Sequence, residues 1–519
     1  MKLRAVMPLA GVLVALTLFS SIVRSGPSGL QVADDAAIAD ALDKNGPVFV
    51  DWKKPKLALL FTGRMNGYLE PCGCAGLDNQ KGGLKRRHTL IRELRDKRKW
   101  PLLALDAGGM VRRIGPQAEM KYRYGLDALV DIGYAAIGVG GRELLLSADA
   151  VLYAIANLDP ETNPLISANV GVFGFDNGFT RRYRVLEQGG LRVGVTSVLG
   201  SEHQEDLANS AEIEWTDPAA GLRQAASQLK RQRCDYQVLL AHTTREEAVA
   251  LAKRFPQFDF VVTTGGAEEP ANAARPIEGT KSQLIETGHK GMYAIVLGLY
   301  GKGQPFEYQK APLDHRYSDS PEMHQMLIEY QREVETLGLS GLGLLGASGQ
   351  GMAHPKGEFA GTAACADCHT EAMAVFEGTP HAHATETLVE LDPPRHYDPE
   401  CLSCHVVGWD PQGYFPYDSG YLGLEATPLM LQNGCENCHG PGAAHVAAEN
   451  GEGDYTDEQI EALRAEMHME LVENEGNNKA RGEVLGPSVK NCLECHDIDN
   501  SPEFDFQEYW PMIEHTGKY

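Results

Sequence analysis

The stretch Gly434-Cys-Glu-Asn-Cys-His-Gly-Pro-Gly442 contains the pattern Cys-x-x-Cys-His, which occurs four times in the last third of the chain. This spacing is typical of c-type haem attachment, in which two thiols bind the porphyrin vinyl groups and the histidine ligates the iron. Zinc, the alternative for paired cysteines, does not account for a histidine directly after each pair. The motifs therefore predict four covalently bound haem c groups, held by Cys365, Cys368, Cys401, Cys404, Cys435, Cys438, Cys492 and Cys495, with His369, His405, His439 and His496 as proximal iron ligands.

Histidine is concentrated in the same region, because 11 of the 17 histidines lie between His354 and His515. Those outside the motifs are numerous enough to give a second axial ligand to three or four irons. Two axial imidazoles produce a six-coordinate iron suited to electron transfer, whereas one imidazole leaves a position open for a small molecule. The count leaves open whether every haem is closed.

The N-terminus has the pattern of a secretion signal. Lys2 and Arg4 precede an apolar run from Val6 to Val23, which is followed by Arg24 and a stretch rich in Gly, Pro and Ser. We therefore expect an extracytoplasmic protein, periplasmic or at the cell surface, in agreement with haem c attachment outside the cytoplasm. The run is long for a cleaved signal and short for a membrane span, so a soluble form and an N-terminally anchored form both remain open.

The charge balance excludes two classes of partner. With 71 acidic and 47 basic side chains, the net charge is −24, which argues against nucleic acid and against anionic membrane surfaces. Contact with a membrane is expected only through the possible N-terminal anchor. The expected partners are redox proteins, either other cytochromes or quinol-linked donors.

Composition changes along the chain and predicts four segments. Residues 1–30 are the signal peptide or anchor, and residues 31–315 alternate short apolar runs such as Leu57–Thr62 and Leu191–Leu199 with helical patterns such as Pro218–Gln232, which indicates a layered α/β domain. Residues 316–357 contain a helix over Pro321–Leu337 and a Gly-rich stretch that reads as a flexible tether. Residues 358–519 carry the haem motifs.

The last segment resembles a known family. The stretches Thr379–Ala384, Gly434–Gly442, Cys492–His496 and Tyr509–His515, in this order, are similar to the tetrahaem cytochrome c-554 family. The resemblance implies a haem-packed domain that is mostly α-helical or irregular. It also implies distal iron ligands at His381, His445 and His515, with His383 as the alternative to His381. Some members of the family have one five-coordinate haem, for which the motif Cys401–His405 would be our choice.

A second resemblance covers the front of the chain. The stretches Leu59–Pro71, Gly82–Arg87, Leu103–Gly108 and Ile137–Glu143 resemble the 5′-nucleotidase branch of the calcineurin-like metallophosphatases. That resemblance implies an α/β/β/α fold in which two metal ions activate water and bind a phosphate.

Most of the family's metal ligands are absent from this sequence. By the resemblance, their positions are taken by Arg64, Asn66, Gly109, Gly141, Arg142, Gly266 and Glu268, and the one that remains is His242. One imidazole and one carboxylate cannot hold two metal ions. We therefore expect no dinuclear metal centre and no phosphatase or nucleotidase activity, and we interpret the front segment as a degenerate member of this fold.

The segment Pro71-Cys-Gly-Cys-Ala75 offers a different chemistry at the same edge of the fold. Cys72 and Cys74 lie outside the haem motifs, and their spacing allows a soft-metal site or a strained, easily reduced disulfide. The whole chain also resembles exported multihaem proteins with a 5′-nucleotidase-like front half, some of which carry selenocysteine in this loop. That resemblance implies a redox-active, catalytic pair, while a structural disulfide or a simple tight loop remains open.

Two functions therefore remain. The first is an electron-transfer protein that passes electrons to or from a partner or a small substrate near the front segment. The second is a multihaem oxidoreductase that reduces an oxyanion or a sulfur species at Cys72 and Cys74 or at an open haem. Arginines near the emptied metal positions could hold such an anion, namely Arg64, Arg112, Arg113 and Arg142.

Overall fold

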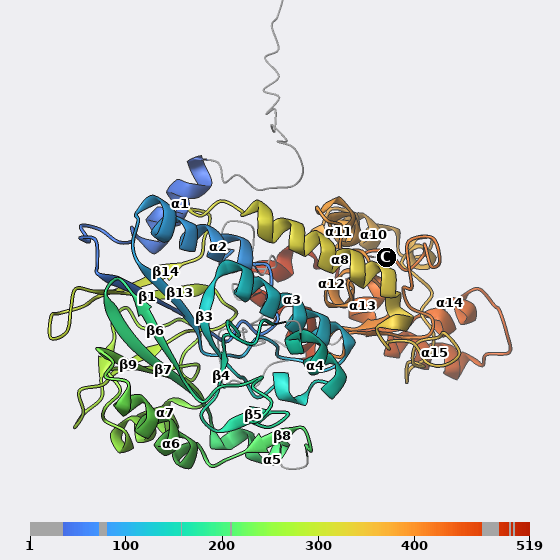
Figure 1. Ribbon diagram of the computed structural model, residues 1–519. Coiled ribbons are helices and arrows are strands. Elements are labelled where there is room, and N and C mark those ends of the chain that lie inside the picture. The colour runs from blue at the N-terminus through green and yellow to red at the C-terminus, as the bar shows by residue number, and fades with distance from the viewer. Residues whose placement is uncertain are drawn as a thin grey trace, which may run out of the picture.

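A computed structural model of the protein describes residues 35–71, 80–156, 158–207, 210–469, 487–497, 500–501 and 504–518 (Figure 1). The predicted signal or anchor at residues 1–30 and the cysteines Cys72 and Cys74 lie outside these ranges. Within the described ranges, no helix has the length and apolar character needed to cross a membrane.

Two six-stranded sheets form the front part, residues 35–315. The first sheet has the strand order β14-β13-β1-β2-β3-β4 and consists of β1 (Leu57–Thr62), β2 (Leu102–Asp106), β3 (Tyr134–Gly138), β4 (Leu165–Ile166), β13 (Tyr293–Leu299) and β14 (Glu307–Pro312). The second has the order β11-β12-β10-β9-β7-β6 and consists of β6 (Arg184–Gln188), β7 (Leu191–Leu199), β9 (Tyr236–His242), β10 (Phe260–Thr263), β11 (Arg275–Pro276) and β12 (Gln283–Glu286). Strands β1 to β4 run parallel to one another, as do β7, β9, β10 and β12.

The sheets and helices form the expected α/β/β/α layers. Side chains from both sheets, including Phe61, Leu105 and Leu240, make one apolar core between them. A second core covers the outer face of the first sheet, beneath α2 (Leu84–Arg92), α3 (Pro116–Ile132) and α8 (Pro321–Gly341). A third lies outside the second sheet, beneath α6 (Pro218–Arg231) and α7 (Arg245–Arg254). Because these strands are buried on both faces, they read as continuous apolar runs in the sequence. The observed layers confirm the expected α/β fold class.

The strands that were not anticipated from the sequence include β6, β12, β13 and β14. The most important is β13, which lies antiparallel between β1 and β14 with Leu297 opposite Leu59, and all its residues are buried. The segment Tyr293-Ala-Ile-Val-Leu-Gly-Leu299 carries the same apolar signal as the strands that were recognised.

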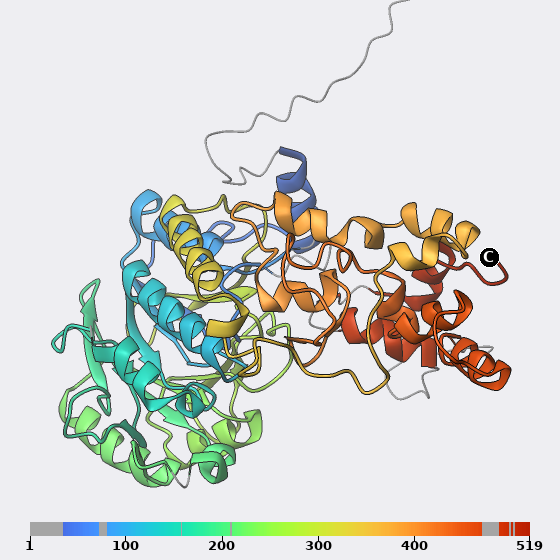
Figure 2. The ribbon, with the colours of Figure 1, turned by 90° about the vertical axis from the view of Figure 1, so that its right-hand side faces the viewer.

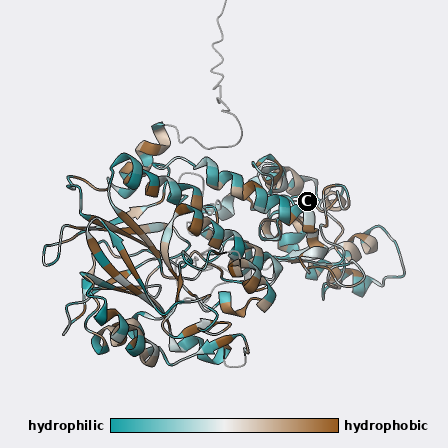
Figure 3. Ribbon diagram, viewed as in Figure 1, coloured by the Kyte–Doolittle hydropathy of each residue, from teal (hydrophilic) through white to brown (hydrophobic). Residues whose placement is uncertain are grey.

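Short helices and irregular segments make up the haem-motif part, residues 358–518 (Figure 2). The second and third motifs lie on α12 (Pro399–His405) and α13 (Cys435–His439). The first motif begins within α9 (Ala363–Ala366), and the fourth lies at the end of α16 (Pro487–Cys495). The other elements are α10 (Thr370–Glu377), α11 (Ala384–Glu390), α14 (Ala443–Glu449), α15 (Asp457–Glu466), α17 (Phe506–Tyr509) and the hairpin of β15 (Trp409–Asp410) with β16 (Phe415–Pro416). In Figure 3, the strands of the front part are coloured largely as hydrophobic residues.

Helix α8 connects the two parts. It continues past the predicted end at Leu337 to Gly341, with a break at Gly338, where φ is 57°. The Gly-rich stretch that follows is packed over part of its length, which differs from the expected flexible tether. Leu344 packs against the apolar cluster of the haem-motif part, and Met352 hydrogen-bonds Pro416 and Asp418 through the backbone.

Candidate haem-binding site

Three of the four motif histidines each face a histidine from outside the motifs. The ring centroids are 5.8 to 6.5 Å apart in the pairs His369–His445, His381–His496 and His439–His515. Imidazole nitrogens bind a metal at about 2.0–2.1 Å, so two rings on opposite sides of one metal have centroids roughly 6 Å apart. All three pairs therefore have the spacing that two axial imidazoles on one iron require.

The pairs cross between motifs. His445 lies on α14, directly after the third motif, yet it faces His369 of the first motif. His381 lies in the short helix η6 (Pro380–His383), after the first motif, and faces His496 of the fourth. Sequence neighbours are thus not spatial partners, which is why the sequence could not assign a distal histidine to each haem.

Hydrogen bonds fix the orientation of the motif histidines. The Nδ1 atoms of His405 and His439 each lie 2.7 Å from a backbone carbonyl oxygen, at Ala384 and Met467 respectively. A ring nitrogen opposite a carbonyl must donate, so Nε2 keeps its lone pair for a metal. Burial lowers the pKa of both histidines, which favours the neutral form that a metal needs.

His405 of the second motif differs from the other three. Within the described ranges, no second histidine ring faces it in the way that His445 faces His369. The alternative ligand His383 is exposed and its Nδ1 lies 2.9 Å from Glu386, so His381 is the member of this segment that approaches a motif histidine. The geometry therefore offers two axial ligands at three motifs and one at the second.

The cysteine thiols show which motifs are neighbours. Cys365 of the first motif lies close to Cys435 of the third, and Cys404 of the second lies close to Cys495 of the fourth. Cys438 of the third motif lies close to Cys492 of the fourth. The four motifs are therefore adjacent in the order first, third, fourth, second. A narrow apolar cavity between the first and third motifs is lined by residues that include Cys365, His369, Met373, Cys435, His439 and His515.

The second motif is also the one that rests on the front part. Lys121 of α3 lies 2.5 Å from Glu400, and Gln117 Nε2 donates to Asp398 at 2.7 Å. Asp398 caps α12 and also accepts from Gln331 of α8 at 2.9 Å. These bonds join the helix of the second motif to both α3 and α8.

A buried charge network reinforces this contact. Arg395 of the haem-motif part pairs with Glu70 of the front part, and Lys85 lies 3.3 Å from Glu70 and 2.8 Å from Asp319. Burial pushes the pKa of Glu70 up, but Arg395 and Lys85 outweigh it and leave the pKa lowered. The carboxylate is therefore charged and paired. Glu70 directly precedes Pro71, which is the last described residue before Cys72.

The residues that the resemblance places at the family's metal-ligand positions make contacts within the protein. Arg64 donates to the carbonyl oxygen of Thr264 at 3.0 Å, and His242 Nδ1 lies 3.3 Å from the carbonyl oxygen of Ala107. The rings of His242 and His203 have centroids 5.5 Å apart. Burial, with His203 and Arg64 nearby, lowers the pKa of His242 to about 3. Within the described ranges, His, Cys, Asp and Glu form no group of three or more that could hold a metal ion.

The carboxylates of this region are bound by protein groups. Asp106 accepts from Thr62 Oγ1 at 2.5 Å and from Gly108 N at 2.9 Å, and burial raises its pKa. Glu143 accepts from the backbone N–H groups of Gly109 and Met110 through Oε1, while no hydrogen bond to its buried Oε2 is found in the described part of the chain. Burial raises the pKa of Glu143 to about 7.

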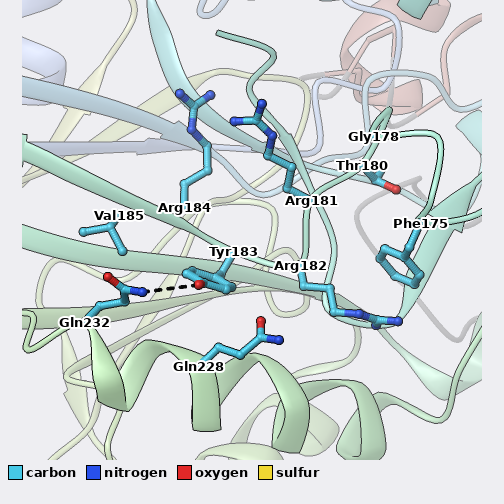
Figure 4. A pocket seen from close by; sticks show the side chains of 10 residues that line it. All are labelled: Phe175, Gly178, Thr180, Arg181, Arg182, Tyr183, Arg184, Val185, Gln228 and Gln232. Carbon is cyan, nitrogen blue, oxygen red and sulfur yellow. Dashed lines mark hydrogen bonds between the residues drawn. The ribbon is translucent and has the colours of Figure 1, made fainter. Parts of the chain in front are cut away.

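A solvent-open pocket of about 550 Å³ lies elsewhere on the front part, beside β6 (Figure 4). Its arginines bind backbone carbonyls: Arg181 donates to Pro160 and Glu161, Arg182 to Ala168, and Arg184 to Thr162 and Asn163. Sequence patterns do not predict this pocket, because loop arginines carry no distinctive spacing. It contains no cysteine or histidine and offers no redox chemistry.

Comparison with known proteins separates the two parts. Residues 364–440 match the family profile "Cytochrome c554 and c-prime". Cytochrome c-554 of Nitrosomonas europaea is 34% identical over 108 residues, which cover 18% of this chain and 43% of that protein. An apyrase of Aedes aegypti is 23% identical over 350 residues, which cover 60% of this chain and 62% of that protein. The chain thus spans 43% to 62% of the length of these two curated relatives.

Solved structures similar to the chain include two from Thermus thermophilus. The 5′-nucleotidase precursor has a TM-score of 0.46 at 19% identity, with 54% of this chain and 59% of that chain covered. The sulfate thiohydrolase SoxB has a TM-score of 0.44 at 12% identity, with 55% of this chain and 62% of that chain covered.

The protein therefore combines a part similar to cytochrome c-554, a likeness that implies covalently bound haem c, with a layered α/β front part similar in sequence to apyrases.

Proposed function

We propose that this protein is an extracytoplasmic tetrahaem cytochrome whose four haems form one electron-transfer chain. The cysteine pairs of the four motifs attach the haems, and His369, His405, His439 and His496 are the proximal ligands. His445, His381 and His515 are the distal ligands of the first, fourth and third haems. The observation that carries the proposal is the set of three facing histidine pairs with centroids 5.8 to 6.5 Å apart.

The order of neighbouring motifs gives the order in which electrons would pass between the haems. Haem c, when bound, supplies a one-electron redox centre at each motif. The thiol contacts link the motifs in the order first, third, fourth, second, so the first and second haems are the two ends. The second end rests on the front part through Lys121 and Gln117. Electrons exchanged with a redox protein at the first haem would therefore arrive beside the front part.

A specific observation supports a second function, a multihaem oxidoreductase. His405 has no facing histidine among the described residues, so the second haem would keep an open axial position for a small oxyanion or sulfur species. Cys72 and Cys74, the other proposed place for such a substrate, lie outside the described residues. The absence of a facing histidine at His405 among the described residues supports the second haem as a catalytic position, and the role of Cys72 and Cys74 stays a prediction.

Spectroscopy of the haem-loaded protein tests this assignment. Mass spectrometry should find four covalent haems per chain, and electron paramagnetic resonance should show three low-spin irons and one high-spin iron. His445→Ala should convert one further iron to high spin, because the first haem loses its sixth ligand. The matched control is His383→Ala, which removes an exposed histidine paired with Glu386 and should leave the spin states unchanged. Four low-spin irons in the wild type would exclude the open second haem, and an unchanged spectrum in His445→Ala would refute the ligand assignment.

A further inference from the structure

The side of the second haem motif that faces the front part is lined by cations. The guanidinium carbon of Arg113 lies 3.1 Å from the centre of the Tyr414 ring. Arg113 is also close enough to Cys404 and Glu400 to act on both groups electrostatically, and Arg112 acts on Glu400 as well. Both arginines belong to the segment between β2 and α3 of the front part. The front part therefore contributes positive charge to a site whose cysteines and histidine belong to the other part.

Arg113 differs from the other cations of this contact in its partners. Lys121 is paired with Glu400 and Arg395 with Glu70. For Arg113, in contrast, no carboxylate of the described residues lies within ion-pair distance. In a chain with a net charge of −24, a half-buried arginine that makes no ion pair with a described carboxylate stands out. Its stacking on Tyr414 uses the face of the guanidinium and leaves the N–H groups at its edge available to an anion.

The surrounding contacts hold this arginine in place. The side chain of Tyr414, which Arg113 covers, is buried, and it follows β15 in the hairpin with β16. In the same hairpin, Gln412 Nε2 donates to the carbonyl oxygen of Glu494 on the helix of the fourth motif, at 2.5 Å. On the front side, the bonds from Lys121 and Gln117 to α12 fix the distance between the two parts. Arg112, Arg113 and Lys121, which together we call the cationic wall, are thus held in place by the fold.

We propose that Arg113 and its neighbours form an anion-binding site between the two parts, at the second haem motif, for small inorganic anions. The proposal rests on the proposed function, because an open second haem makes such an anion a candidate substrate. The proposal adds that the substrate is negatively charged. It also assigns a role to the front part, which supplies the arginine that binds the anion, while the haem-motif part supplies the iron site. The positive charge of Arg113 also favours the reduced state of the second haem, because the reduced haem carries one positive charge fewer than the oxidised haem.

The test uses the full-length, haem-loaded protein with azide as an anionic probe and imidazole as a neutral probe. In Arg113→Gln, the dissociation constant for azide at the high-spin haem should rise about tenfold, because a charge-assisted contact is lost. Imidazole should bind as it does to the wild type. In the same variant the midpoint potential of that haem should fall by about 59 mV if its reduction equilibrium shifts tenfold. Arg113→Lys should keep the potential, because it keeps the charge.

Arg192→Gln is the matched control, since Arg192 is an exposed arginine of β7 paired with Glu187, and it should change neither quantity. Equal weakening of azide and imidazole in Arg113→Gln, or no change in azide affinity and potential, would overturn the proposal. If neither probe binds to the wild type, the open second haem is refuted, whereas the potential shift of Arg113→Gln still reports the cationic wall. The two failures are therefore distinguishable.

Discussion

The front part and the haem-motif part are held together by different means. The front part buries three apolar cores between and outside two six-stranded sheets. Among its described residues, the haem-motif part has two small apolar clusters, one around Leu402 and Trp409 and another around Val489 and Phe504. Its interior is instead lined by cysteines and facing histidines. One part therefore folds by burying its own side chains, and the other has its interior arranged around groups that it must receive.

This difference extends to the chemistry of the two sites. In the front part, arginines, hydroxyls and backbone groups occupy the surroundings of Asp106 and His242, so these side chains are already bound by the protein. In the haem-motif part, half-buried imidazoles face one another with room for a metal between them. The site around Asp106 and His242 is thus filled by protein groups, whereas the facing histidines leave a space of the size that a metal ion needs.

The largest effect is expected when the haems are withheld. Protein produced without haem attachment should keep a folded front part, because its cores need no cofactor, while the haem-motif part should lose its ordered structure. Limited proteolysis should remove residues beyond about 340 and leave a fragment that still unfolds cooperatively on heating. Resistance of the haem-motif part to protease in the absence of haem would break the comparison.

A smaller effect is expected at the contact between the parts. Arg395→Met leaves Glu70 without its closest cation in a largely buried position. Removing one partner of a buried ion pair is strongly destabilising, and we expect a loss of about 3 kcal/mol in the free energy of unfolding. Urea unfolding of the haem-loaded protein measures it. Arg464→Met, at the exposed pair with Glu449, is the control and should have a much smaller effect, because water screens an exposed ion pair. Equal effects of the two substitutions would show that the contact does not couple the parts.

The buried carboxyl of Glu143 predicts a pH effect within the front part alone. Its pKa is raised to about 7 by burial, above the value of about 4.3 in an unfolded chain. Between these values the folded state holds more protons than the unfolded state, so stability falls as pH rises from about 4.3 to 7. Glu143→Gln cannot ionise, and it should be about 2 kcal/mol more stable than the wild type at pH 8 and similar to it near pH 4. Thermal unfolding across this pH range checks the sign, and a stabilisation that is independent of pH would contradict it.

The smallest effect is expected for hydrolysis. Nucleotides and phosphomonoesters should be hydrolysed at background rates with manganese, zinc or calcium added, because the sequence lacks the ligands for a metal pair. Assays with each metal, with His242→Ala alongside the wild type, make the measurement. Metal-dependent turnover that disappears in His242→Ala would show that the front part has kept its older chemistry.

Sequence patterns predicted the two parts unequally well. In the front part, buried parallel strands read directly as apolar runs, so the predicted bounds of β1 and β7 agree with the structure. In the haem-motif part, the motif spacing predicted the attachment residues, but it could not predict that His445 faces His369 or that His381 faces His496. Such pairs depend on how short, irregular segments cross in space. Nor could it predict that Arg113 stacks on Tyr414, because that contact joins segments some 300 residues apart whose local patterns are independent.

The crossing of the histidine pairs also has a consequence for the order in which the protein is completed during synthesis and export. If the pairs act as proposed, the first haem receives its distal ligand only when His445 has emerged, and the third haem waits for His515. The fourth haem finds its distal ligand, His381, already present. The second haem waits for no later histidine, and the surface that receives it, which includes Arg113 and Lys121, emerges long before it. Maturation would therefore begin at the second haem, against the preformed front part, and end with the pair at the C-terminal end of the chain.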